Sequence, residues 1–198
     1  IPFGTALQYA NEVGKKTGVR PAFLLAILTQ ESNLGENVGQ CLVTDFVTGD
    51  GVGKNTGTPF SGIMKPGRDI PPFLELAKKL GFDARSRPVS CPQPGGYGGA
   101  MGPSQFIPST WAGYAARIAT ALGVTVADPW LPKHAFAASS LYLADLGASA
   151  GGYTAEHTAA AKYYAGSGWQ TRGMGYATSV MNHAKNIQEN MINPLEGL

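Results

Sequence analysis

Glu31 is the side chain of this sequence whose setting most favours acid–base chemistry. It follows an apolar stretch, residues 20–30, and precedes Gly35, which suits the left-handed end of a helix. In the last turn of such a helix, the negative end of the helix dipole and neighbouring apolar side chains both raise the pKa of a carboxyl. A carboxyl that stays partly protonated near neutral pH can donate a proton to a leaving group, as cleavage of a glycosidic bond requires. The alternative is an ordinary solvated glutamate at a helix end.

Two further stretches carry groups that suit a sugar ligand. Residues 98–111 combine glycines, which let the backbone approach a ligand, with Gln105, whose amide both donates and accepts hydrogen bonds. Residues 160–169 end a predicted helix in small residues and include Tyr163, Tyr164 and Trp169. Each stretch alone is more commonly structural, but their occurrence together and in this order favours a carbohydrate site.

The three stretches resemble the successive signatures of lytic transglycosylases, the lysozyme-like enzymes that cleave peptidoglycan. Glu31 and Ser32 resemble the catalytic Glu-Ser pair of that family. Residues 99–110, Gly-Ala-Met-Gly-Pro-Ser-Gln-Phe-Ile-Pro-Ser-Thr, resemble its Gly-Ala-Met-Gly-Leu-Met-Gln-Leu-Met-Pro-x-Thr block, with a small residue before the Gln as in the membrane-bound B-type branch. Residues 161–168 resemble its Ala-Ala-Tyr-Asn-Ala-Gly-x-Gly block. The resemblance covers the helical framework but not residues 40–95.

The resemblance implies a substrate and a role for each matching residue. The substrate is the β-1,4 bond between MurNAc and GlcNAc in peptidoglycan glycan strands, which Glu31 cleaves as general acid and then general base, with formation of 1,6-anhydro-MurNAc. Tyr163 matches the tyrosine that hydrogen-bonds the catalytic carboxyl, and Tyr164 stands where Asn is usual. The residues implied to bind substrate or to support the site are Ser32, Met101, Gly102, Ser104, Gln105, Phe106, Tyr163 and Tyr164.

Two other functions remain open on the same scaffold. If Asp45, Asp50, Asp69 or Asp83 supplies a second carboxylate at the distance that inverting glycosidases use, water could attack directly and the protein would be a hydrolytic muramidase. A catalytically silent peptidoglycan-binding module is the other alternative, which Tyr164 in place of Asn slightly favours.

Other chemistries lack their motifs, so we expect neither a metal nor a cofactor. The glycine-rich residues 49–55 resemble a phosphate loop, but Asn55 follows Lys54 where Ser or Thr is required. The three histidines are widely spaced and have no zinc-ligand companions. Ser167 misses the first glycine of a nucleophile elbow.

The chain has two cysteines, Cys41 and Cys91, separated by a long segment rich in Gly, Pro, Thr and Asp. A disulfide is the simplest interpretation, and two unrelated buried thiols are the alternative. Because disulfides persist mainly outside the cytosol, the pair predicts an extracytoplasmic location in the periplasm, in the cell envelope or outside the cell.

Composition narrows the possible partners. The 198 residues are 43% hydrophobic and 14% charged, with a formal net charge of +2, which is typical of a globular domain. No run of Lys or Arg suits a phosphate backbone, and no apolar stretch approaches the length of a membrane span. We therefore expect no nucleic acid partner and no membrane span in this chain. The resemblance implies peptidoglycan glycan strands as the partner, and we expect a monomer.

Apolar spacing predicts a mainly α fold, a lysozyme-like helical domain over residues 1–198 with an insertion at about 40–95. The insertion is closed by the disulfide and has β character around residues 42–47, where a turn at 49–57 could join two strands of a short hairpin. The predicted helices cover residues 4–17, 71–81, 108–122, 133–146, 154–164 and 173–191. A further predicted helix has Pro21 in its first turn, Glu31 in its last turn and Gly35 as its cap.

Overall fold

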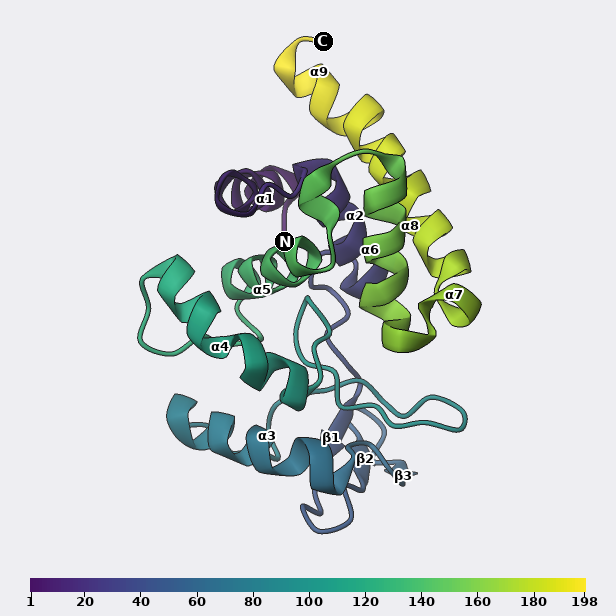
Figure 1. The fold of residues 1–198 in the computed structure, drawn as a ribbon. Coiled ribbons are helices and arrows are strands. Elements are labelled where there is room, and N and C mark those ends of the chain that lie inside the picture. Colours follow the sequence, from purple (N-terminus) through teal and green to yellow (C-terminus); the bar gives the residue numbers. More distant parts are fainter. The chain divides into compact units, whose positions relative to one another are not determined.

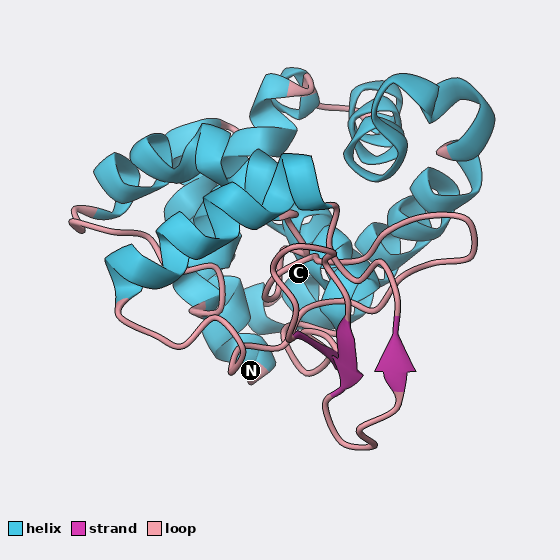
Figure 2. Ribbon diagram, turned by 90° about the horizontal axis from the view of Figure 1, so that it is seen from below, coloured by secondary structure: helices cyan, strands magenta, loops and turns pink.

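Helices dominate the fold, as the spacing of the apolar side chains predicts. A computed structural model describes all 198 residues and contains one small three-stranded sheet among the helices (Figures 1 and 2). The chain divides into two units, one formed by residues 1–34 and 136–198 and the other by residues 35–135. The predicted mainly α class with a disulfide-closed insertion is confirmed.

The first unit is entirely helical. Its helices are α1 (Phe3–Thr17), α2 (Pro21–Ser32), α6 (Tyr153–Ala165), α7 (Trp169–Arg172), α8 (Met174–Ile187) and α9 (Asn193–Glu196), with short helical turns at Ala148–Ala150, Gly166–Gly168 and Gln188–Ile192. Helix α5 (Pro132–Asp145) begins at the end of the second unit and continues into the first.

Helix α2 forms the core of the first unit. All residues from Ala22 to Leu28 are buried, so the buried surface of this helix is not confined to one side. A helix that is hydrophobic on every side is buried on every side, and here α1 and α8 pack against it (Figure 1). Arg20, at the N-cap of α2, forms two hydrogen bonds of 2.9 and 2.7 Å with the buried carboxylate of Glu156 on α6.

Helix α2 ends before the residue that the sequence suggested. The left-handed cap is Asn33, with φ of 49°, and Leu34 and Gly35 also have positive φ. Asn tolerates this conformation better than other residues with a side chain, so the helix does not need the glycine to end. Glu31 nevertheless lies in the last turn of the helix, as predicted.

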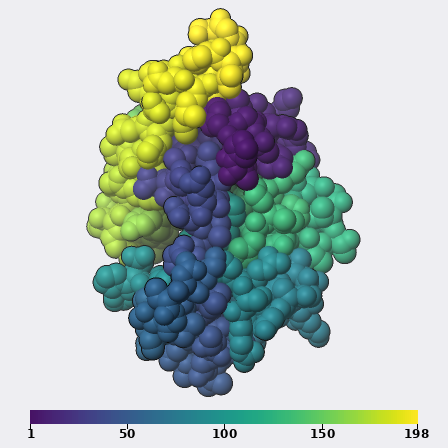
Figure 3. Space-filling view, turned by 180° about the vertical axis from the view of Figure 1, so that it is seen from behind, coloured from purple at the N-terminus to yellow at the C-terminus, as the bar shows by residue number.

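The C-terminal part of the first unit is less regular than the single predicted helix of residues 173–191. Helix α8 ends at Ile187, a π-helical turn follows at Gln188–Ile192, and α9 completes the chain. The space-filling view shows these last residues, in yellow, projecting next to the purple N-terminal helix (Figure 3). No helix of the protein has both the length and the apolar character needed to cross a membrane.

The second unit holds the small sheet and two long helices. Strands β1 (Cys41–Val43), β2 (Gly51–Gly53) and β3 (Pro59–Phe60) pair antiparallel in the order β1-β2-β3, with Cys41 opposite Gly53 and Val52 opposite Pro59. Helices α3 (Pro66–Leu80) and α4 (Pro108–Leu122) lie side by side (Figure 1). Buried Asp69 of α3 joins them, because its Oδ1 accepts a 3.0 Å hydrogen bond from the backbone N–H of Ser109 in the first turn of α4.

Three local expectations in the second unit are wrong. Helix α3 begins at Pro66 instead of Pro71, so Pro71 lies inside the helix. Strand β2 lies within the stretch that was expected to be only a turn. Val47, expected in a strand, is instead in an exposed turn, because the Asp45 side chain accepts hydrogen bonds from the backbone N–H groups of Val47 and Thr48.

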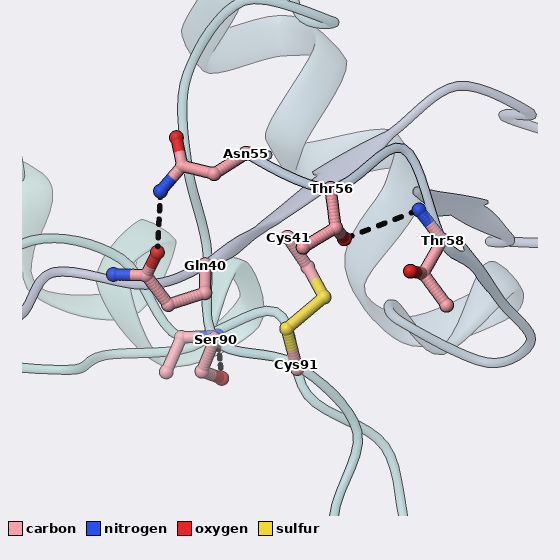
Figure 4. The surroundings of a disulfide bond; sticks show 8 residues. Gln40, Cys41, Asn55, Thr56, Thr58, Ser90 and Cys91 are labelled. Carbon is pink, nitrogen blue, oxygen red and sulfur yellow. Dashed lines mark hydrogen bonds between the residues drawn. A yellow bond between two sulfur atoms is a disulfide. The ribbon is translucent and has the colours of Figure 1, made fainter. Parts of the chain in front are cut away.

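The predicted disulfide between Cys41 and Cys91 is confirmed. The two Cα atoms are 5.1 Å apart across a sequence separation of 50 (Figure 4). Backbone hydrogen bonds between Cys41 and Val89, at 3.0 and 2.9 Å, hold the two chain segments together beside the bridge. The sheet and α3 both lie between the two cysteines in sequence.

Replacing both cysteines by serine is expected to lower the free energy of unfolding by about 4 kcal/mol, because a loop of this length would regain its conformational freedom in the unfolded chain. Urea unfolding of the oxidised protein and of the Cys41→Ser, Cys91→Ser variant measures the difference. Equal unfolding midpoints for the two proteins would show that the bridge does not stabilise the fold.

Candidate active site

The carboxyl group of Glu31 lies at the C-terminal end of α2, partly buried and one turn beyond the buried Ile27 and Leu28. Its Oε1 accepts a hydrogen bond of 2.5 Å from the hydroxyl of Tyr176, in the first turn of α8. The packing of α8 against α2 therefore positions this bond. No protein group hydrogen-bonds the second oxygen, Oε2.

Two opposing effects set the pKa of Glu31. Burial disfavours the charged carboxylate and raises the pKa from its ordinary value of 4.5 to about 7, while the hydrogen bond from Tyr176 favours the carboxylate and limits the rise. Burial is the larger effect. Glu31 is therefore present in both protonation states near neutral pH, as a group that first gives and then takes a proton must be.

A cluster of tyrosines surrounds this carboxyl within the first unit. The hydroxyl of Tyr163 on α6 lies 2.9 Å from Ser139 Oγ on α5, and its ring lies 5.3 Å from the ring of Tyr142. Burial, with the negative charge of Glu31 as a second cause, raises the pKa of both Tyr163 and Tyr176 well above the ordinary value. Both phenols therefore stay neutral and keep a proton to donate.

Tyr164 lies on the outside of the cluster. Its side chain is 60% exposed, and its ring stacks on the ring of Tyr176 with the centroids 4.7 Å apart and the planes 12° from parallel. Although Tyr163 and Tyr164 are adjacent in sequence, one contacts Ser139 in the interior and the other covers Tyr176.

Ser32, the other residue of the expected catalytic pair, is buried. Its hydroxyl donates a hydrogen bond of 3.3 Å to the backbone oxygen of Leu28 in the preceding turn. This bond joins the side chain of Ser32 to the preceding turn of α2.

The remaining expected site residues form one tight loop of the second unit. The backbone N–H of Met101 donates to the oxygen of Phe106 at 2.9 Å and closes the loop. Gln105 has a φ of 54°, and its side-chain amide donates a 2.9 Å hydrogen bond to the oxygen of Gly102. A side chain at Gly102 would lie 1.8 Å from the backbone oxygen of Pro129, so only glycine fits there.

The loop is packed rather than open. The side chains of Met101, Ser104 and Phe106 are buried, and the ring of Phe106 packs edge-on against that of Trp111 at 6.1 Å between centroids. Gln105 is only partly buried. Within residues 101–106, Gln105 is thus the one residue that remains partly accessible, and its side chain is held by the bond to Gly102.

The aspartates considered as a second catalytic carboxylate all have structural partners within the second unit. Asp45 and Asp83 accept backbone N–H groups in their own turns, and Asp50 accepts the N–H of Gly62 at 2.7 Å. Buried Asp69 pairs with Arg68 in addition to its bond to α4. No group of three or more His, Cys, Asp or Glu side chains is placed to hold a metal ion.

Tyr176 is the hydrogen-bond partner of Glu31 that sequence reasoning missed. The expected donor to the catalytic carboxyl was Tyr163, but the hydroxyl bonded to Glu31 is that of Tyr176. Tyr176 lies outside the three stretches that carry the resemblance, and only the packing of α8 against α2 brings it to Glu31. A tyrosine in the first turn of a helix after the last of the three stretches was the available signal.

A partly buried carboxyl with a raised pKa, set in a helical framework with a disulfide-closed insertion, fits the expected lysozyme-like class of glycan-cleaving enzymes. The family model described as the transglycosylase SLT domain matches residues 5–163. The chain belongs to this family, and its function is that of a peptidoglycan lytic transglycosylase.

Solved structures agree with this fold. The Escherichia coli lytic transglycosylase Slt35, solved in complex with bulgecin A, is similar with a TM-score of 0.66 and 15% sequence identity, over 96% of this chain and 72% of that one. The soluble lytic transglycosylase SltB1 from Pseudomonas aeruginosa is similar with a TM-score of 0.63 and 17% identity, over 99% of this chain and 77% of that one. Among curated proteins, no sequence matches.

Tyr176→Phe is expected to raise the pKa of Glu31 above about 7, because the variant loses the hydrogen bond that favours the carboxylate while burial remains. The pH at which activity declines on the alkaline side should therefore move upward. Tyr163→Phe is the matched control, since its hydroxyl bonds Ser139, and it should move this pH less. A larger shift in Tyr163→Phe than in Tyr176→Phe would contradict the assignment.

Glu31→Gln is expected to stabilise the protein increasingly as the pH rises from about 4.5 to about 7. In this window the unfolded chain has lost the Glu31 proton and the folded protein still holds it, so the wild type loses stability with rising pH. The advantage of the variant should level off above that window, at no more than about 3 kcal/mol. Thermal melts of both proteins from pH 4 to 9 measure it, and a difference independent of pH would contradict a raised pKa.

Proposed function

We propose that Glu31 carries the reaction alone, first as the general acid and then as the general base. The observation that supports this most directly is the unequal use of its two oxygens. Tyr176 holds Oε1, and Oε2 has no protein partner. With a pKa of about 7, Oε2 can carry a proton toward a substrate oxygen and take one back at the same pH.

In the first step, Glu31 Oε2–H protonates the oxygen that joins MurNAc C1 to GlcNAc, and the C1–O bond breaks. The 2-acetamido group of the same MurNAc stabilises the electron-poor C1. In the second step, the Glu31 carboxylate takes the proton of the MurNAc C6 hydroxyl, and O6 bonds to C1 to close the 1,6-anhydro ring. Glu31 is protonated again at the end, so no water is consumed and no second protein carboxylate is required.

The roles of the other residues are also proposals. Tyr176 orients Glu31 and tunes its pKa, Ser32 supports the end of α2, and Tyr163 and Tyr164 complete the aromatic surroundings. In the loop of the second unit, we assign Gln105 to the polar groups of the glycan. Gly102 gives the loop its close turn, and Met101, Ser104 and Phe106 keep it rigid.

We further propose that residues 1–198 act as one catalytic domain with an insertion at about 40–95, since the family match runs through segments of both units. The block that ends in Ser104 and Gln105 supports a kinship with the membrane-bound B-type branch. The disulfide supports an extracytoplasmic location, in the periplasm or beyond. We propose a monomer that acts on peptidoglycan glycan strands.

Digestion of purified peptidoglycan followed by mass spectrometry of the muropeptides tests the function. Wild-type protein is expected to release products with anhydro ends, one water lighter than hydrolytic products. Glu31→Gln, which keeps the shape of the side chain but has no proton to transfer, should reduce the rate by about 10²-fold or more.

Three outcomes would contradict the proposal. Reducing ends would indicate a hydrolytic muramidase, and unchanged sacculi with bound protein would indicate a binding module. An active Glu31→Gln protein would remove Glu31 from the acid and base roles.

A further inference from the structure

Tyr164 is an exposed aromatic residue with a specific partner. Its ring lies nearly parallel to that of Tyr176, yet 60% of the side chain remains accessible to solvent. Its hydroxyl has no hydrogen-bond partner in the protein. Tyr164 therefore contacts the site through its ring. The ring contacts Tyr176, the residue that donates a hydrogen bond to Glu31.

The stack joins two helix ends. Tyr164 lies in the last turn of α6 and Tyr176 in the first turn of α8, with η2 (Gly166–Gly168) and the short α7 in the chain between them. Tyr176 lies at a helix terminus, where helices fray, so contacts with neighbouring side chains can contribute to its orientation. A flat ring against one face of Tyr176 restricts the rotation that would take the hydroxyl away from Glu31.

We propose that Tyr164 is a positioning residue for the reaction: by stacking on Tyr176 it holds the Tyr176 hydroxyl on Glu31 Oε1. The inference rests on the proposed role of Glu31. It adds Tyr164 to Glu31 and Tyr176 as a third residue of the catalytic arrangement. It also gives Tyr164, which stands where Asn is usual, a role that does not require direct contact with the substrate.

The charges around Glu31 are compatible with this role. The titratable groups that act on the carboxyl are the phenols of Tyr176 on α8 and Tyr163 on α6, and Tyr142 on α5 contacts Tyr163 in turn. Burial raises the pKa of each of these three phenols. No phenol therefore changes charge in the pH range where Glu31 titrates, so a shifted titration of Glu31 reports on its burial and on its hydrogen bond.

A double-mutant cycle tests the proposal on the pKa of Glu31. The four proteins are the wild type, Tyr164→Asn, Tyr176→Phe and the double variant, and carboxyl-carbon NMR of glutamate-labelled protein gives the pKa in each. We expect Tyr176→Phe to raise the pKa in the wild-type background and to raise it by less than half as much in the Tyr164→Asn background, because the bond to be removed is already weakened. Equal shifts in both backgrounds would overturn the proposal.

Two control variants test whether the effect of Tyr164 comes from its ring. One removes only the Tyr164 hydroxyl, and the other replaces a different exposed tyrosine. Tyr164→Phe keeps the stack and should retain the wild-type pKa and turnover, whereas Tyr164→Asn should lower turnover about 3- to 10-fold. A Tyr164→Phe protein as impaired as Tyr164→Asn would overturn the proposal in favour of direct substrate contact by the hydroxyl. Tyr153 is the matched control at the other end of α6, being 61% exposed and stacked on His157, and Tyr153→Asn should leave both measurements unchanged.

The NMR titration needs no substrate, so its outcome does not depend on the reaction assigned to the protein. If peptidoglycan digestion fails to give anhydro products, the proposed function fails while the cycle can still show that Tyr164 positions Tyr176. If digestion succeeds and the cycle shows independent effects, only the positioning role is lost.

Discussion

The competition between burial and one hydrogen bond at Glu31 is the interaction on which the rest of the account depends. Burial alone would raise the pKa of this carboxyl further. The bond from Tyr176 stabilises the carboxylate enough to bring the pKa to about 7. In the reaction we propose, the phenol holds Oε1, Oε2 serves both proton transfers, and the nucleophile belongs to the substrate.

The fold of the first unit is what makes this balance possible. Helix α2 is buried from Ala22 to Leu28, and Glu31 lies in its last turn, at the edge of the core. Because Glu31 belongs to the helix and not to a loop, its backbone is held in place by the packing of α2. At the opposite end of α2, the pair formed by Arg20 and Glu156 anchors the first turn to α6. Helix α8 packs on the same helix and supplies Tyr176, and the stack with Tyr164 extends this support to the end of α6.

The parts of the structure that could be predicted from sequence are those set by local patterns. The apolar run before Glu31 predicted both the helix and the raised pKa, and the cysteine pair predicted the disulfide. The tyrosine bonded to Glu31 could not be predicted, because no local pattern reports that α8 packs on α2. The misplaced strand at Val47 has another cause: the Asp45 side chain captures nearby backbone N–H groups and outweighs the β propensity of the following residues. Asn33 ended α2 early for a similarly local reason, its tolerance of positive φ.

The titration of Glu31 in the wild-type protein tests the central claim most directly. Carboxyl-carbon NMR with glutamate-labelled protein, assigned by comparison with Glu31→Gln, gives the pKa of this one group without substrate or turnover. The account predicts a midpoint near pH 7. A midpoint at the ordinary value of 4.5 would mean that the carboxyl is already ionised at neutral pH, and it would contradict the role of Glu31 as the proton donor.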